Sequence, residues 1–236
     1  MIVLAIDSSH PAGSVALSVG GEASGSARFG DGSSHLAEIG RAVQSVLAGA
    51  GVAVTDVGRI ALVQGPGSFT GLRIGMAYAK GLCAGLRADM VVMSTLELLA
   101  TPLLRAGTVV CPMVDARRGE VYGAVYQPVA GPARHGALAL VAPCALEAGA
   151  LAAQAKQYKP VYLGTGAVRN RSLLESIDPG CRTEGEVASQ PSTALLAEIA
   201  PVLDPLPVED LASLEPIYVR PSDAVFKPLK PVDPHG

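Results

Sequence analysis

Apolar residues along the first hundred positions recur with a period of two at first and then with a period of three or four. Three alternating runs predict β-strands at residues 2–6, 14–19 and 22–28. From residue 34 to about residue 50, one apolar stripe recurs at helical spacing and predicts an amphipathic helix. The stripe consists of Leu36, Ile39, Val43, Val46, Leu47 and Ala50.

A further strand and helix follow. Residues 59–63 form a short apolar run that predicts a strand. The segment GPGSFTGLRIG at 65–75 connects this strand to a helix that ends near Leu86, and another short helix is predicted at 96–104.

The same order of elements then begins again, which indicates a structural repeat. The second series consists of strands at 109–114, 120–127 and 137–141, a helix at 144–156 and a strand at 161–163. In each half the first strand ends in an aspartate, Asp7 or Asp115, and a turn and an alternating strand follow. Two βββαβα units with facing aspartates are typical of the α/β actin-like fold (ASKHA, or ribonuclease H-like).

This repeat sets the predicted domain organisation. We expect a first lobe at 1–104 and a second lobe at 105–200. Residues 201–236 are rich in proline, so we expect a segment that packs back in part and ends in a loose tail.

The composition limits the class of protein. Hydrophobic residues make up 49% of the 236 residues and charged residues 17%, so the chain can bury a substantial core. The net charge of −3 argues against strong direct binding to nucleic acid, which usually requires a basic excess. The four cysteines lie far apart without a CxxC motif and fit a reducing compartment. The pattern contains no signal peptide and no membrane-spanning run, so we expect a cytoplasmic protein.

The loop at 65–75 precedes a helix with two apolar sides. It lacks the GxxxxGK[ST] pattern of a P-loop, so its signal for phosphate binding is weak. One side of the helix carries Leu72, Met76, Ala79, Cys83 and Leu86 and is expected to cover the sheet. The other side carries Gly71, Gly75, Tyr78, Leu82 and Gly85.

Glycine inside a helix costs about 1 kcal/mol relative to alanine, and the close approach of another backbone can compensate for that cost. Two interpretations of the second side stay open. Either the same domain fills both sides, or the glycine-containing side forms a helix-on-helix interface with a partner. In the second case Arg73 and Lys80 would lie at the polar rim of the interface.

Motifs for catalysis are weak throughout the sequence. The four histidines form neither HxxxH nor HExxH, and no GxSxG is present. Ser68 has no identifiable histidine partner. Asp7, Asp115 and Glu120 have the chemistry to bind Mg²⁺ around a nucleotide, but nothing else in the sequence requires that they do.

Three segments carry a likeness to a known family. They read MIVLAIDSSHPAGSVAL at 1–17, GPGSFTGLRIGMAYAKGL at 65–82 and MVDARRGEVYGAVY at 113–126. In these segments the chain resembles the TsaB (YeaZ) family of bacterial proteins, the non-catalytic partners of the TsaD threonylcarbamoyltransferase. The likeness extends to about Arg220.

The resemblance implies an actin-like fold and a role in forming N6-threonylcarbamoyladenosine (t6A) beside the anticodon of tRNAs that read codons starting with A. It also implies pairing with a TsaD-type subunit through the helices at 34–50 and 71–86. A TsaE-type ATPase would join this pair, and tRNA would be reached only through the complex.

The catalytic relative holds its metal with two histidines four residues apart. The matching positions here are Met93 and Glu97. Methionine is a soft, weak metal ligand, and one carboxylate cannot form the site alone. The resemblance and the ligand chemistry therefore predict a non-catalytic subunit that requires no cofactor, with ATP and metal in the partner subunits. Residues 162–170 look like a version of the relative's nucleotide-binding stretch, so a residual nucleotide cleft is also predicted. It would be formed by Asp7, Ser8, Asp115, Gly164, Gly166 and Asn170.

Our main hypothesis is therefore a scaffold subunit that holds the catalytic partner and that self-associates as a homodimer in its absence. The predicted interface consists of Leu36, Ile39, Val43, Gly71, Arg73, Gly75, Tyr78, Leu82 and Gly85. The second hypothesis is an actin-like enzyme that binds ATP on its own, with Asp7 and Asp115 around the Mg²⁺-nucleotide. A peptidase is the least supported of the three.

Overall fold

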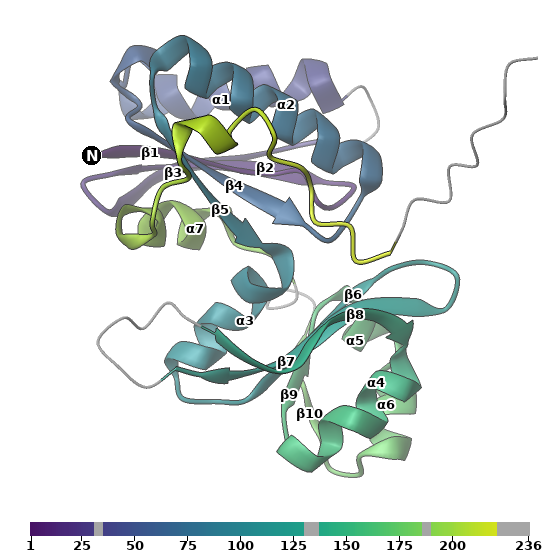
Figure 1. The fold of residues 1–236 in the computed structure, drawn as a ribbon. Helices are drawn as coiled ribbons and strands as arrows, with labels where there is room; N and C mark the ends of the chain where they lie inside the picture. Colours follow the sequence, from purple (N-terminus) through teal and green to yellow (C-terminus); the bar gives the residue numbers. More distant parts are fainter. Residues whose placement is uncertain (31–34, 130–136, 186–189, 221–236) are drawn as a thin grey trace, which may run out of the picture.

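A computed structural model describes residues 1–30, 35–129, 137–185 and 190–220. These residues form two lobes, each built on a five-stranded sheet, with α3 lying between the two sheets (Figure 1). None of the helices in these ranges is long and apolar enough to cross a bilayer.

The sheet of the first lobe has the strand order β3-β2-β1-β4-β5. Its strands are β1 (Ile2–Asp7), β2 (Gly13–Val19), β3 (Glu22–Phe29), β4 (Arg59–Gly65) and β5 (Asp89–Ser94). The first three strands pair antiparallel, whereas β1, β4 and β5 pair in parallel. The sequence pattern predicted the first four strands, but it missed β5, a short apolar run between two helices.

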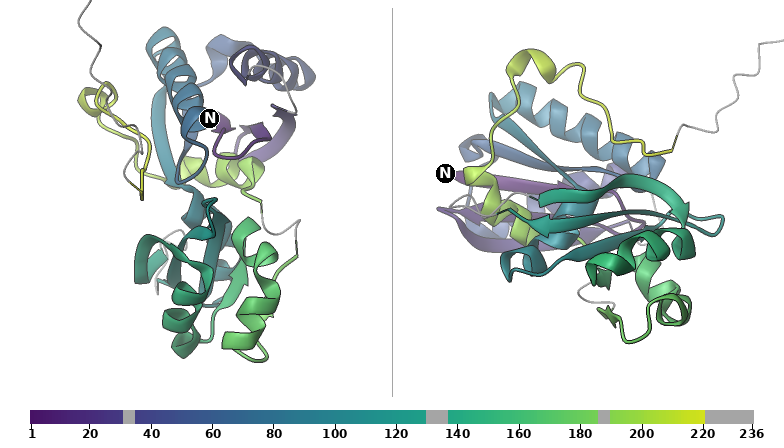
Figure 2. Two further views of the ribbon diagram at one scale, coloured as in Figure 1. Left: turned by 90° about the vertical axis from the view of Figure 1, so that its right-hand side faces the viewer. Right: turned by 60° about the horizontal axis from the view of Figure 1, so that its bottom comes forward.

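Helices cover both faces of this sheet. On one face lie α1 (His35–Ala50) and α2 (Phe69–Leu86), whose apolar stripes pack on β1, β2 and β4 in one core cluster. On the other face, α7 (Thr193–Ile199) and part of α3 (Thr95–Arg105) pack on the same strands. Figure 2 shows the three layers in two further views.

The sheet of the second lobe repeats this arrangement, with the order β10-β9-β6-β7-β8. Its strands are β6 (Val110–Asp115), β7 (Glu120–Pro128), β8 (Ala137–Glu147), β9 (Val161–Leu163) and β10 (Arg182–Thr183). Its helices are α4 (Ala148–Ala155), α5 (Thr165–Arg169) and α6 (Arg171–Ile177). The predicted repeat and the two-lobed α/β fold are therefore confirmed.

Two predicted boundaries differ from the structure. The helix expected from Cys144 begins only at Ala148, because residues 144–147 pair with β7 and extend β8. Helix α7, which the predicted division assigns to the second lobe, packs instead on β1, β2 and β3 of the first.

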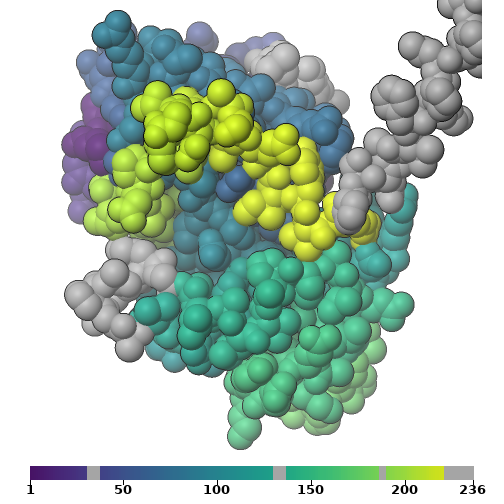
Figure 3. Space-filling view, in the orientation of Figure 1, coloured from purple at the N-terminus to yellow at the C-terminus, as the bar shows by residue number. Residues whose placement is uncertain are grey.

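The segment that follows α7 returns along the first lobe. The backbone N–H of Leu206 donates to the carbonyl of Met90 at 2.8 Å, and that of Ile217 to the carbonyl of Gln64 at 2.9 Å. Leu206, Leu211 and Leu214 extend the core beneath α1 and α2. We call residues 204–220 the C-terminal segment; Figure 3 shows it in yellow-green and yellow across the face of the first lobe. Short 3₁₀ turns occur at Val54–Asp56, Lys156–Tyr158, Ala200–Val202 and Val208–Asp210.

Candidate functional site

The glycine-rich loop before α2 holds the turn that follows β1. Ser68 is the N-cap of α2, and its hydroxyl accepts a hydrogen bond from the Gly71 N–H at 3.3 Å. Its own N–H donates to the Ser9 carbonyl at 2.7 Å. A Cβ atom on Gly67 or Gly71 would collide with the carbonyl of Ser9 or Ser8, respectively. The loop therefore needs its glycines for close contact with its own lobe.

Gly75 has the same role one turn further along α2. A Cβ atom there would collide with the Ser8 hydroxyl, and both Gly71 and Gly75 are buried. These two glycines therefore contact the lobe that contains them. Gly71 and Gly75 are therefore not left open for a partner, contrary to the interface predicted from the sequence.

The C-terminal half of the helix differs. Gly81 and Gly85 are exposed, and a Cβ atom on either would meet no other atom within 4 Å. Tyr78 is half-buried, and its hydroxyl lies 3.9 Å from where a Cβ of Gly40 on α1 would be. Leu82 packs partly against the core.

The remaining residues of the predicted interface occupy other environments. Ile39 and Val43 are buried in the core beneath α1, so they are not on the surface of the chain. The side chain of Leu36 falls outside the described residues. Arg73 is exposed, but its Nε donates to the Tyr218 hydroxyl at 3.0 Å. Lys80 donates to the carbonyls of Ala212 and Leu214, so the C-terminal segment engages both cations that were expected at the rim.

The outer surface of α1 and α2 is uncharged over residues 42–50 and 81–86. Both helices connect parallel strands, so both run antiparallel to those strands and their C-terminal halves lie at the same end of the sheet. Residues 42–50 and 81–86 contain no Asp, Glu, Lys or Arg. The exposed positions in these two ranges are Gln44, Ser45, Ala48, Gly49, Gly81, Ala84 and Gly85, and we add the exposed Ala77, which lies one turn before Gly81. We call these eight residues the uncharged helix surface.

A cleft of about 570 Å³ separates the two lobes. The first lobe lines it with residues 9–11 and 67–70, and the second lobe with residues 114–117, Tyr122 and Thr165. Asp115 accepts hydrogen bonds from the Arg117 backbone N–H at 2.9 Å and from Arg169 Nη1 at 2.6 Å.

Few of the predicted nucleotide residues line this cleft. A Cβ on Gly164 would collide with the Met113 carbonyl, and one on Gly166 would lie 2.7 Å from Val121, so both glycines serve internal packing. The Asn170 amide donates to the Gly166 carbonyl at 2.8 Å.

Ser8 is buried against α2, and Asp7 lines a different cavity. Only Asp115 of the predicted set lines the cleft between the lobes. The two aspartates that the second hypothesis placed around one nucleotide therefore line two different cavities.

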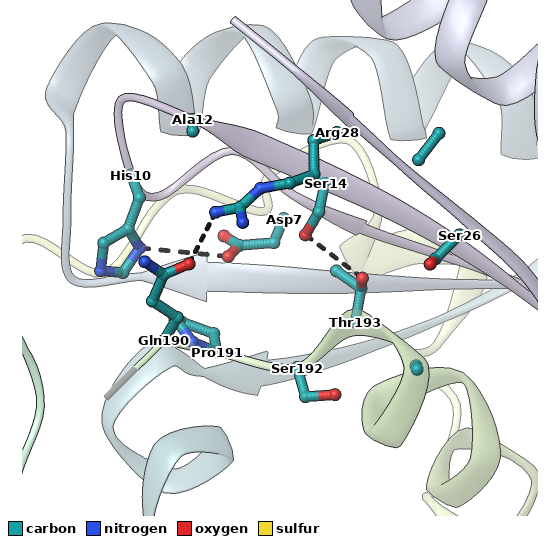
Figure 4. A pocket seen from close by; sticks show the side chains of 12 residues that line it. Asp7, His10, Ala12, Ser14, Ser26, Arg28, Gln190, Pro191, Ser192 and Thr193 are labelled. Carbon is teal, nitrogen blue, oxygen red and sulfur yellow. Dashed lines mark hydrogen bonds and ion pairs between the residues drawn. The ribbon is translucent and has the colours of Figure 1, made fainter. Parts of the chain in front are cut away.

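The cavity at Asp7 lies beside the turn after β1 and has a volume of about 200 Å³ (Figure 4). Residues 7–14 contribute one wall, residues 26–28 of β3 a second, and residues 190–194 a third. No sequence motif pointed to this cavity, because its walls come from segments that lie more than 150 positions apart.

A serine, a histidine and an aspartate meet beside this cavity without forming a catalytic triad. The Ser9 hydroxyl lies 2.8 Å from Nδ1 of His10, and the Asp7 carboxylate lies 4.0 Å from the same nitrogen. In a triad the serine and the aspartate contact opposite ring nitrogens. This geometry therefore gives the peptidase hypothesis no support.

The positions that match the relative's metal ligands are largely inside the protein. Met93 is buried, and burial raises the pKa of the half-buried Glu97 carboxyl. No three His, Cys, Asp or Glu side chains converge in a metal-binding arrangement within the ranges that the structure describes.

Burial also raises the pKa of the Cys83 thiol to about 11. This direction is typical of a cysteine that packs in a core and is not a reactive thiolate.

Comparison with known proteins gives the family. A family model described as "TsaD: tRNA N6-adenosine threonylcarbamoyltransferase" matches residues 32–168. The tRNA threonylcarbamoyladenosine biosynthesis protein TsaB of Escherichia coli (strain K12) is 40% identical over 129 residues, which are 54% of this chain and 55% of that protein. The protein of the same name from Bacillus subtilis (strain 168) is 41% identical over 86 residues, 36% of this chain and 38% of that protein. The chain thus spans about half the length or less of these curated relatives.

A solved structure extends the likeness over both lobes. The structure of YeaZ from Pseudomonas aeruginosa matches with a TM-score of 0.73 and 26% identity, covering 92% of this chain and 99% of that one. The chain belongs to the family described by the TsaD model and, within it, to the TsaB (YeaZ) proteins.

Proposed function

We propose that this chain acts in the synthesis of N6-threonylcarbamoyladenosine in tRNA, as a non-catalytic subunit that binds a TsaD-type catalytic subunit. The uncharged helix surface carries the proposal. Helices on the surface of a soluble protein usually carry charged residues, whereas the centres of protein interfaces are depleted of them. The small side chains on this surface would let the helices of a partner approach closely.

Two features support a subunit without catalysis of its own. Met93 and Glu97 stand where the catalytic relative has its histidines, and a methionine with one carboxylate cannot make that metal site. The glycines that resemble the relative's nucleotide-binding stretch pack against β6 and β7 instead. ATP and metal then belong to the partner subunits, and this subunit requires no cofactor.

The same surface explains the other proposed assemblies. Without the catalytic subunit, an uncharged surface of two parallel helices would pair with its own copy about a twofold axis. A TsaE-type ATPase would join the assembled pair. Since the net charge of the chain is −3, tRNA would be reached through the complex rather than by this subunit alone.

Reconstitution tests this proposal. The purified chain, the catalytic subunit and the ATPase are assayed separately and together for t6A formation on an unmodified tRNA, with ATP and an activated threonylcarbamoyl donor supplied in every mixture. We expect modification only when this chain and the catalytic subunit are both present. Modification by this chain alone would contradict the non-catalytic role, and full activity without it would contradict the role of a required subunit.

A further inference from the structure

The cavity at Asp7 has a polar lining that the proposed function does not use. Its volume of about 200 Å³ lies below the roughly 300–1,000 Å³ of pockets for drug-sized ligands. At about 30 Å³ for each water molecule, it has room for six or seven waters or for one small organic molecule.

A carboxylate forms one wall of this cavity. The Asp7 side chain is only 4% exposed, and one of its oxygens accepts the Ser9 backbone N–H at 2.8 Å. The other oxygen lies 4.0 Å from Nδ1 of His10, which is too far for a hydrogen bond. A buried carboxylate of this kind is costly unless a cationic or hydrogen-bonding group completes its shell.

A guanidinium group forms a second wall. Arg28 extends from β3, and its Nη2 donates to the neutral side-chain oxygen of Gln190 at 2.6 Å. Among the described residues, no carboxylate lies within 4.0 Å of this guanidinium. Figure 4 shows Asp7 and Arg28 facing the same space between His10 and Thr193. The cavity therefore presents one negative and one positive group. Neither group forms a close salt bridge with an oppositely charged side chain among the described residues.

Neutral polar groups complete the lining. The Thr193 hydroxyl lies 3.2 Å from the Ser14 hydroxyl, on the side of the cavity away from His10. Nδ1 of His10 lies on the side of Asp7, and its other ring nitrogen points away from Asp7 and Arg28 (Figure 4). The Ser14 and Thr193 hydroxyls are therefore the neutral hydrogen-bonding groups on this side of the cavity.

We propose that this cavity binds a small α-amino acid in its zwitterionic form. The ammonium group lies against the Asp7 carboxylate, and the carboxylate of the amino acid accepts from the guanidinium of Arg28. A hydroxyl on the amino acid side chain hydrogen-bonds to Ser14 and Thr193. A simple anion would fit less well, because the Asp7 carboxylate would repel it. This inference goes beyond the proposed function and does not depend on it.

Calorimetric titration of the full chain tests the proposal, with L-threonine as the probe because it carries all three groups. N-acetyl-L-threonine lacks the ammonium group and L-threoninol lacks the carboxylate. Because a hydrogen bond to a charged group is worth about 1.5–3 kcal/mol, we expect each analogue to bind at least about tenfold more weakly than L-threonine. Equal binding of the analogues would overturn the zwitterion assignment.

Variants localise the binding. Arg28 is exposed on a strand at the sheet edge, so Arg28→Gln should fold normally and weaken L-threonine binding about tenfold or more. Asp7→Asn should do the same, with its fold checked by circular dichroism. The matched control is Arg105→Gln, at the exposed end of α3, which should bind like the wild type.

Two results would reject the site. One is the absence of L-threonine binding to the wild type at about 10 mM, and the other is unchanged binding in Arg28→Gln. Inorganic phosphate serves as a further probe. If phosphate binds and Asp7→Asn strengthens that binding, the cavity is an anion site and the amino acid proposal is wrong.

Discussion

The two halves of α2 use glycine for opposite purposes. In the N-terminal half, Gly71 and Gly75 let the helix contact the backbone and hydroxyl of Ser8 within the same lobe. In the C-terminal half, Gly81 and Gly85 face open space, next to the uncharged outer side of α1. The same residue type thus serves internal packing at one end of the helix and faces open space at the other.

This difference decides which substitutions should affect folding and which should affect assembly. A larger side chain at Gly71 or Gly75 has nowhere to go, because the turn after β1 lies against the helix there. A larger side chain at Gly81 or Gly85 extends into open space and changes only the surface that the helix offers.

The largest expected effect is that of Gly75→Leu. The new side chain would collide with Ser8, so we expect the free energy of unfolding to fall by about 3 kcal/mol or more. The matched control is Gly81→Leu, at a position that is open in the structure. Urea denaturation of both variants measures the difference, and equal stability of the two would refute the distinction between the halves.

A smaller loss is expected from Lys80→Met, near the boundary between the two halves. The ammonium group donates to the carbonyls of Ala212 at 2.9 Å and Leu214 at 2.7 Å, and its loss leaves the C-terminal segment less firmly held. Because Lys80 is partly exposed, we expect a loss of about 1–2 kcal/mol in the free energy of unfolding.

Hydrogen exchange at the Ile217 N–H, which is bonded to the Gln64 carbonyl, should rise in the same variant. Lys156→Met, at an exposed position in the second lobe, is the control for removing a positive charge. Unchanged exchange at Ile217 in Lys80→Met would mean that Lys80 does not fix the C-terminal segment.

The smallest expected effect has the opposite sign. Gly81→Ala replaces a glycine inside a helix at a position with free space, so it should raise the free energy of unfolding by about 0.5–1 kcal/mol. Thermal or urea unfolding would measure this gain. A loss of stability would show that the chain itself already fills the space around Gly81.

Most of the fold could be predicted from periodicity. Most strands of both lobes alternate or form short apolar runs, and the stripes of α1 and α2 that face the sheet follow helical spacing, so local pattern was sufficient for these elements. The two-residue strand β10 carries no such pattern and was not predicted. Strand β5 was missed because its six residues, DMVVMS, read equally well as part of a buried helix. The start of α4 was misplaced because pairing with β7, a distant segment, extends β8 through residues 144–147.

The candidate sites could be predicted only in part. Periodicity showed that α2 has two apolar sides. It did not show that Ser8 packs against Gly71 and Gly75 on the second side, because that contact depends on how the turn after β1 lies in space. The cavity at Asp7 was missed for a related reason. Arg28 and Gln190 are 162 positions apart and meet only because α7 returns to the first sheet.

The dissociation constant for the TsaD-type subunit is the measurement that tests the account most directly. Ala84→Arg places a charge on the uncharged helix surface, and Ala153→Arg places the same charge at an exposed alanine of α4 in the second lobe. We predict a folded Ala84→Arg monomer that binds the catalytic subunit at least about tenfold more weakly, since a charge buried in an interface without a partner costs more than 1.4 kcal/mol. Ala153→Arg should bind like the wild type. Wild-type affinity in Ala84→Arg would contradict the assignment of this surface as the interface.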